Sequence, residues 1–257
     1  MDEPEVRMTF VEHLEELRVR LFRSIVALAI CTVGAMFFYK ALVGIMTVPH
    51  FRAMSWLDIP ASHAKLLAES YGGPVMATMK LCLIVGLFAA SPVVGREMWA
   101  FVAAGLYRHE RRAAAAFAPI SFLLFLLGCV FGYFVLVPYA LYGMGQMIPR
   151  EQISFVFGYS SYLSLVLTMT LLLGAVFQLP LAMVLLTRLG LVPPAAYLRK
   201  WRHATIGILV VSALISPADV ISLLVFAVPL LALYALGIAA AFLAAPRPAS
   251  VPAAALT

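Results

Sequence analysis

The chain has 257 residues, of which 64% are hydrophobic and 12% are charged, and it carries a formal net charge of +6. Because soluble domains are about 25% charged, this composition excludes an ordinary soluble protein and indicates an integral membrane protein. The three cysteines lie in apolar stretches without a redox or metal-binding spacing, so the sequence predicts no disulfide framework, no metal site and no cofactor.

The N-terminal region is predicted to be a retained membrane helix rather than a cleaved signal. It is acidic, through Asp2, Glu3 and Glu5, and no small-residue cleavage site follows the first apolar run. Thr9 and Glu12 have the spacing of a capping box, which predicts an amphipathic helix that continues into the first span.

Glu15 and Glu16 are the first candidate binding residues, because they open the first apolar segment in a basic setting that includes Arg18. Two interpretations of Glu16 stay open. It can form an ordinary helix pair with Arg20, four residues later, which would contribute only about 0.3 kcal/mol. Alternatively, its carboxylate is exposed to a cationic ligand. The relative roles of Glu15 and Glu16 are also open.

Six apolar stretches predict membrane-spanning helices, since a helix needs about 20 apolar residues to cross a bilayer. They cover residues 21–41, 75–95, 113–141, 160–187, 204–216 and 220–243. The fifth is too short to cross unaided, and Pro217 and Asp219 predict a tight turn after it. We therefore expect an all-α polytopic membrane protein with a short hairpin of the fifth and sixth helices. Its single integral domain would cover 1–245, before a short disordered tail at 246–257.

The distribution of basic residues predicts the orientation in the membrane. Of the 18 Lys and Arg residues, 13 lie at the two termini and in the second-to-third and fourth-to-fifth connections, and four lie in the opposite connections. By the positive-inside rule, both termini are cytoplasmic. The net charge then reflects topology and contact with anionic lipid, and nothing suggests nucleic acid as a partner. The long outer connection, 42–74, is expected to be a structured cap.

Glu110 is the second candidate binding residue, because it is a single carboxylate in a cytoplasmic connection beside Arg108, Arg111 and Arg112. These arginines could neutralise it as part of a solvated charge run. A carboxylate can also accept a guanidinium in bidentate fashion, a geometry that favours arginine over lysine. Glu16 and Glu110 together could hold two adjacent arginines.

Two polar residues lie within the predicted spans. Lys80 is expected to snorkel to the outer interface, rather than to act in proton or substrate transfer. Gln178 must face a partner helix or a wet cavity, because an unbonded amide in hydrocarbon is costly. Two interpretations of Gln178 stay open: contact with a polar residue of a small single-span partner, or helix packing beside Pro180.

Several segments carry a family resemblance, above all FVEHLEELRVRL at residues 10–21 and GLYRHERR at residues 105–112. Further matching segments are 91–92 with 99–101, 131–134 with 138, 177–180 and 216–220. Over about residues 8–240 the chain resembles the TatC family, the multispanning component of the twin-arginine protein translocase.

The resemblance implies a signal-peptide receptor and translocase core, not an enzyme. Such a protein exports folded precursors across the bacterial or archaeal cytoplasmic membrane, driven by the proton-motive force. By matching positions, Glu16 and Glu110 are the recognition pair. Other family-pattern positions, with roles in signal-peptide contact, structure or partner contact, are Arg18, Pro49, Lys80, Phe101, Tyr133 and Asp219. Gln178 departs from the pattern, because many relatives have a titratable Glu there.

The resemblance also implies partners and a shape. The partners are twin-arginine signal peptides, single-span subunits of the TatA and TatB type, membrane lipid and further copies of the chain in a larger complex. The apolar part of the peptide would lie along a concave, lipid-facing groove.

Two rival classes fit the sequence less well. A secondary transporter would need midplane ionisable groups at a repeat interface, and the spans offer only Lys80, Gln178 and two threonines without an internal repeat. Solute uptake by the purified protein alone would revive that class. An intramembrane protease would need a Ser/His pair, paired aspartates or a zinc motif within the spans, and the sequence has none of these.

Overall fold

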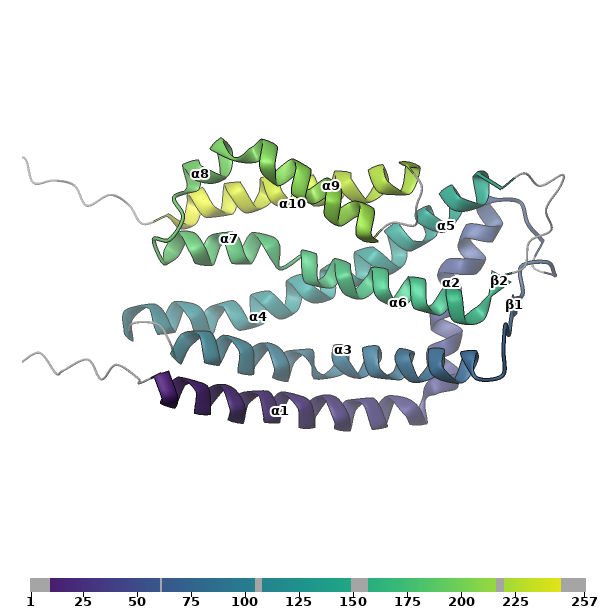
Figure 1. Cartoon of the computed structure of the whole chain (residues 1–257), viewed down its shortest axis with the longest axis horizontal. Coiled ribbons are helices and arrows are strands. Elements are labelled where there is room, and N and C mark those ends of the chain that lie inside the picture. Colours follow the sequence, from purple (N-terminus) through teal and green to yellow (C-terminus); the bar gives the residue numbers. More distant parts are fainter. Residues whose placement is uncertain (1–9, 61, 105–107, 149–156, 216–219, 246–257) are drawn as a thin grey trace, which may run out of the picture.

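The computed structural model describes residues 10–60, 62–104, 108–148, 157–215 and 220–245. Side chains are described for most of these residues, and those of 108–116 are among the exceptions. The helices are α1 (Phe10–Phe37), α2 (Tyr39–Trp56), α3 (Gly73–Ala104), α4 (Arg108–Phe131), the π-helix η1 (Gly132–Leu136), α5 (Val137–Gln146), α6 (Tyr159–Val176), α7 (Leu179–Arg188), α8 (Pro194–Arg199), α9 (Trp201–Ile215) and α10 (Val220–Ala244). Long helices lie side by side in alternating directions, and one steeply inclined helix, α2, closes the end opposite the start of α1 and the end of α10 (Figure 1).

Five segments of the described chain are long and apolar enough to cross a membrane, which supports the predicted multi-pass membrane protein. They are 14–37, 73–102, 117–146, 159–188 and 222–244. The predicted fifth segment corresponds to α9, whose apolar part, 201–214, is shorter than these five. A six-span count therefore stays a prediction. The predicted turn with Asp219 lies outside the described residues.

The predicted first span is divided between two helices. Helix α1 ends at Phe37, and Phe38 leaves the helical conformation with φ −106° and ψ 13° before α2 begins. Apolar residues continue through this break, so hydropathy gave no sign of it. Helix α2 and strand β1 (Leu66–Leu67) lie in the segment expected to be a structured cap, and β1 pairs in parallel with β2 (Phe157–Gly158).

The main core lies among α3, η1, α5, α6, α9 and α10, where large apolar side chains such as Leu163, Leu173 and Phe226 are fully buried. Helix α1 is peripheral and packs mainly on α3. Only 6% of its apolar stretch is buried within the protein, against 33–39% for the spans formed by α3, by α4 to α5 and by α6 to α7. In a bilayer, most of the surface of α1 is therefore left for lipid or a partner.

Pro49 and Tyr133, two of the predicted positions, share one structural role. Pro49 lies inside α2 and has no N–H, so it cannot satisfy the carbonyl of Ile45 four residues earlier. The Tyr133 hydroxyl, from the π-helix, donates a hydrogen bond to that carbonyl. The hydroxyl of Tyr162 donates to the carbonyl of the next residue, Met46, at 2.6 Å. Two tyrosines thus fix the inclined helix α2 to the bundle.

Candidate acidic site at the α1–α3–α4 end

Both predicted acidic sites lie in helices that meet at one end of the bundle. The start of α1, the end of α3 and the start of α4 lie together there (Figure 1). Glu16 belongs to the second turn of α1, and Glu110 belongs to the first turn of α4. The side chain of Glu110 is not among those described, so only the position of its helix is known.

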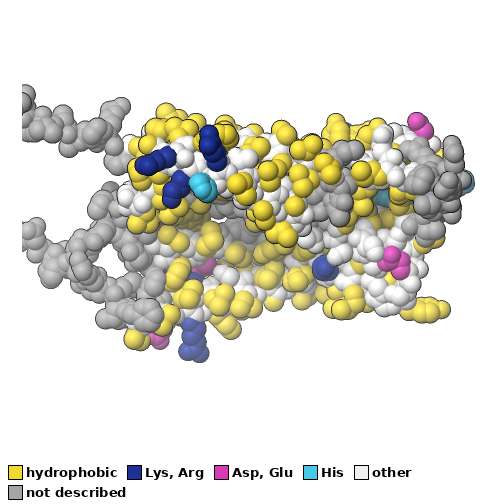
Figure 2. Space-filling view, turned by 45° about the horizontal axis from the view of Figure 1, so that its top comes forward, with side chains coloured by type: hydrophobic (Ala, Val, Ile, Leu, Met, Phe, Trp, Pro, Cys, Tyr) yellow, Lys and Arg dark blue, Asp and Glu magenta, His cyan; other side chains and the backbone are white. Residues whose placement is uncertain are grey.

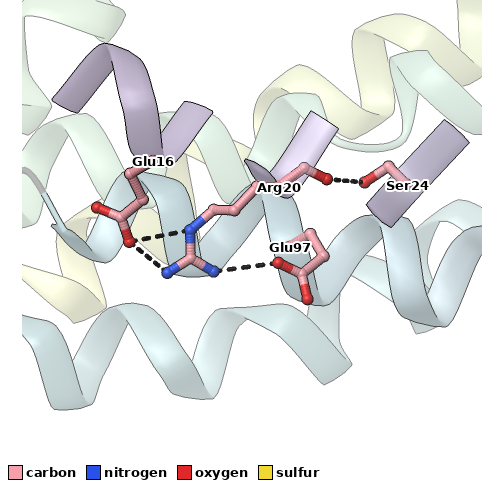
Figure 3. Close-up of polar contacts among 4 residues, drawn as sticks. All are labelled: Glu16, Arg20, Ser24 and Glu97. Carbon is pink, nitrogen blue, oxygen red and sulfur yellow. Dashed lines mark hydrogen bonds and ion pairs between the residues drawn. The ribbon is translucent and has the colours of Figure 1, made fainter. Parts of the chain in front are cut away.

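Glu16 is part of a three-residue cluster of opposite charges (Figure 3). The Nε of Arg20 donates to Glu16 Oε1 at 3.0 Å, and Nη2 of the same guanidinium bonds the same oxygen. Its remaining nitrogen, Nη1, donates to Oε2 of Glu97 at 3.2 Å. Arg20 therefore bridges a carboxylate on its own helix and a carboxylate on α3.

This cluster is largely removed from solvent. The side chains of Arg20, Glu16 and Glu97 are 20%, 17% and 10% exposed. The second oxygen of Glu16, Oε2, is buried and has no hydrogen-bond partner in the described part of the chain. Because a carboxylate that is buried without a donor is costly, Oε2 is a site at which an additional N–H donor would stabilise the cluster.

A surface hollow adjoins the cluster. Its volume is about 330 Å³ and it is lined by Glu15, Glu16, Val19, Arg20 and Arg23. Glu15 is exposed at this hollow. If Glu97 is counted with the lining, three carboxylates stand against two guanidinium groups, so the region carries one negative charge in excess. A cation such as another guanidinium is the ligand that this charge favours.

One of the two interpretations of Glu16 is thus found in the structure, because Glu16 and Arg20 form the predicted i,i+4 pair. The sequence did not reveal the third member, Glu97. In the sequence, Glu97 is marked only as one acid beside Arg96, near the end of an apolar segment. Linking it to Glu16 requires the register between α1 and α3, two helices whose contacting residues are 77 positions apart.

Two further predicted site residues lie near the same helix ends. Phe101 follows Glu97 by four residues, so it lies on the same face of α3, and it is half-buried. Arg18 is exposed and is not part of the hollow's lining.

Lys80 and Gln178 lie in other parts of the structure. Lys80 is exposed, and its Nζ donates to Ser164 Oγ at 3.1 Å. Gln178 stands between α6 and α7 and exchanges two hydrogen bonds with Ser121 of α4. Ser121 Oγ donates to Gln178 Oε1 at 2.7 Å, and Gln178 Nε2 donates to the Ser121 carbonyl at 3.0 Å. Its amide is thus satisfied within the chain, in keeping with the helix-packing interpretation, and contact with a partner protein stays a prediction.

Comparisons with known proteins agree with this architecture. A family model described as "Sec-independent protein translocase protein (TatC)" matches residues 12–229. The chain is similar to TatCy of Bacillus subtilis, with 32% identity over 90% of this chain and 88% of the relative. It is also similar to TatC of Koribacter versatilis, with 36% identity over 93% of this chain and 87% of the relative. A crystal structure of a twin arginine translocase receptor, TatC, superposes with a TM-score of 0.77 at 32% identity, covering 91% of this chain and 99% of that one.

Proposed function

Because the chain belongs to the TatC family of Sec-independent protein translocase proteins, we propose that its acidic α1–α3–α4 end is the receptor site for twin-arginine signal peptides. The chain is a transport protein, a component of the twin-arginine translocase, and not an enzyme. In the proposed mechanism, Glu16 and Glu110 each accept one of two adjacent arginines of a precursor.

The observation that carries this proposal is the cluster around Arg20. Glu16 and Glu97 already hold a guanidinium with three hydrogen bonds, so the geometry that recognises arginine is present. One buried carboxylate oxygen is left without a partner, and the hollow beside it leaves room for a ligand. Lysine carries a single ammonium in place of a planar fork, and would match this geometry less well.

The other predicted residues have supporting roles in this proposal. Glu15 adds negative charge at the hollow, Arg18 and Phe101 contact the flanking parts of the peptide, and the apolar part of the peptide lies along a concave, lipid-facing groove. The residues proposed for structure or partner contact are Pro49, Lys80, Tyr133, Gln178 and Asp219. The small buried share of α1 leaves surface within the lipid region for such a contact.

We further propose that both termini are cytoplasmic, in a bacterial or archaeal cytoplasmic membrane. Thirteen of 18 basic residues lie on the terminal side, as the positive-inside rule requires. In keeping with this, basic side chains gather over the end of the bundle that contains α8 (Figure 2). The exposed basic residues there are Arg199 at the end of α8, Lys200 between the helices and Arg202 in α9.

Single-span TatA and TatB type subunits and further copies of the chain are the proposed protein partners, and the proton-motive force is the proposed energy source. The mostly unburied α1 and the short α9 are the surfaces that we assign to such partners. A short apolar helix leaves the bilayer locally thinner, which favours packing against another span.

Binding of a fluorescent twin-arginine peptide to the purified protein in detergent tests the receptor site. Each of Glu16→Gln and Glu110→Gln should weaken binding about tenfold, because a charge-assisted hydrogen bond is lost. A twin-lysine peptide should bind more weakly than the twin-arginine peptide. Glu69→Gln is the matched control, since Glu69 is an exposed carboxylate that accepts hydrogen bonds from Ser161 near β1. Unchanged affinity in both site variants, with both still folded, would refute the assignment.

A further inference from the structure

Arg20 bonds only one of the two carboxylate oxygens of Glu16. Both Nε and Nη2 bond one carboxylate oxygen, Oε1, whereas a fork-to-fork pair uses both oxygens of the acid. The other oxygen, Oε2, is buried and unpartnered in the described structure. Another guanidinium can form a complete two-oxygen pair with Glu16 only if Arg20 gives up Oε1.

Glu97 can keep the Arg20 guanidinium paired if Arg20 leaves Glu16. Its side chain is only 10% exposed, and it already accepts a hydrogen bond from Arg20 Nη1. The guanidinium has five N–H donors, so it can form further hydrogen bonds with Glu97 after leaving Glu16. The backbone of Arg20 needs no movement for this, because its carbonyl stays within α1, where Ser24 Oγ donates to it at 3.0 Å.

We propose that Arg20 is a resident guanidinium that competes with the signal peptide for Glu16, and that Glu97 is the positioning residue that receives Arg20 when an arginine of the peptide binds. This inference rests on the proposed receptor function and adds a mechanism to it. In the free protein, one guanidinium is shared by two acids. In the complex, each acid has its own guanidinium, and the negative charge in excess is neutralised.

The role of Glu97 follows from the cost of releasing Arg20. If the carboxylate at position 97 is absent, an Arg20 that leaves Glu16 becomes a partly buried cation without a partner, which is unfavourable. Arg20 then stays on Glu16 and the peptide must compete against a tighter internal pair. Glu97 therefore promotes binding of the peptide although the peptide need not contact it.

The test measures twin-arginine peptide affinity for the wild type and for Glu97→Gln, Arg20→Gln, the double variant and Glu97→Asp. Glu97→Gln should weaken binding about tenfold, the scale of one charge-assisted hydrogen bond. Removing Arg20 as well should restore the affinity for the peptide. The double variant should therefore bind within about threefold of the wild type, well short of the tenfold loss in Glu97→Gln. Arg20→Gln alone should bind at least as tightly as the wild type. Glu97→Asp keeps the charge and should behave as the wild type.

Three results decide whether Arg20 moves to Glu97 when the peptide binds. Wild-type affinity in Glu97→Gln overturns the proposal, and so does a double variant as weak as Glu97→Gln, because a merely structural role is not rescued by removing Arg20. Glu16→Gln is measured in the same series. If it also binds normally, the assignment of Glu16 to the receptor site is wrong, whereas a weak Glu16→Gln beside a normal Glu97→Gln rejects only the transfer of Arg20. Glu69→Gln and Arg199→Gln, at exposed positions, are the charge-loss controls.

Discussion

At the scale of single residues, the tyrosine hydroxyl that satisfies the Ile45 carbonyl shows how a membrane protein compensates for a proline. Pro49 removes one helical hydrogen bond from α2, and Tyr133 supplies the missing donor from the π-helix. A carbonyl without a donor would be costly here, because this hydrogen bond is part-buried. The family-pattern position of Tyr133 is thereby given a structural role.

Tyr133→Phe should lower the free energy of unfolding by about 1 kcal/mol, because the Ile45 carbonyl loses its hydrogen-bond donor. Thermal unfolding in detergent, followed by circular dichroism, measures the effect. Tyr139→Phe is the matched control, since Tyr139 is 49% exposed and packs against Trp56 through its ring. Equal midpoints for the two variants would contradict the role of this hydrogen bond.

The sequence predicted the local part of the acidic site and missed the part formed by tertiary contact. The pair of Glu16 and Arg20 follows from helical spacing alone. The contact of Arg20 with Glu97 depends on how α1 and α3 are aligned, and no pattern in one sequence reveals that alignment. Ser121 was likewise missed as the partner of Gln178, because it belongs to a different helix.

At the scale of elements, the close approach of α1 to α3 depends on Gly86. A Cβ atom at this position would lie 2.7 Å from Thr32 Cα and 2.8 Å from Thr32 N, which are backbone atoms that cannot turn aside. The alignment that brings Arg20 to Glu97 therefore requires the absence of a side chain at position 86.

Apolar periodicity predicted that these segments are helices, but the break at Phe38 depends on how α2 packs across the bundle.

Gly86→Ala should destabilise the protein by about 1–3 kcal/mol, because it forces α1 away from α3. Gly95→Ala is the matched control in the same helix, since a Cβ there has nothing within 4 Å. Alanine is also a better helix former than glycine, so the control should be neutral or slightly stabilising. Chemical unfolding in detergent distinguishes the two, and a Gly86→Ala protein as stable as the control would contradict the close packing.

Helix α2, which is not one of the five spanning segments, contains a buried histidine. His50 is 1% exposed, and its Nε2 lies 2.8 Å from the Ala64 carbonyl oxygen. Aromatic rings of Phe51, Phe157 and Tyr162 surround it. Burial lowers the pKa of His50, and the hydrogen bond to Ala64 opposes that shift.

A lowered pKa in the folded state gives a definite sign to the pH dependence. The unfolded chain binds the proton near its ordinary pKa of about 6.5, whereas the folded chain resists it. The contribution of His50 to stability is thus complete above this pH and declines as the pH falls below it, until the folded pKa is reached. Unfolding midpoints from pH 8 to pH 5 should fall in the wild type and fall less in His50→Gln. His203→Gln, at an exposed position, should keep the wild-type slope; an identical slope in His50→Gln would contradict the prediction.

At the scale of the whole molecule, the bundle places its acidic site at the end where its basic connections gather. Composition and apolar runs were sufficient to predict a multi-pass helical membrane protein, because the bilayer constrains element length and polarity strongly. The short α9 was also foreseen from its length. The inclination of α2 and the β1–β2 pairing were not, since they are set by contacts between distant segments.

The proposed orientation predicts which positions an impermeant thiol reagent reaches in intact cells. In a variant without the native Cys31, Cys82 and Cys129, Ser62→Cys should be labelled from outside. Ala195→Cys in α8 should be labelled only after the membrane is opened. Both positions are exposed, so accessibility within the protein does not separate them. The reverse pattern would place the acidic site on the wrong side for an incoming precursor.

The central claim, that two carboxylates at one end of the bundle hold two arginines of a precursor, is tested most directly by double-mutant cycles. Each of Glu16→Gln and Glu110→Gln is combined with replacement of the first or second peptide arginine by glutamine, and the four affinities of each cycle are measured. We expect Glu16 to couple to one arginine and Glu110 to the other by about 1 kcal/mol or more, as for directly contacting charged pairs. The same cycles with Glu69→Gln should give none. Coupling energies near zero for both acids with both arginines would contradict the shared site.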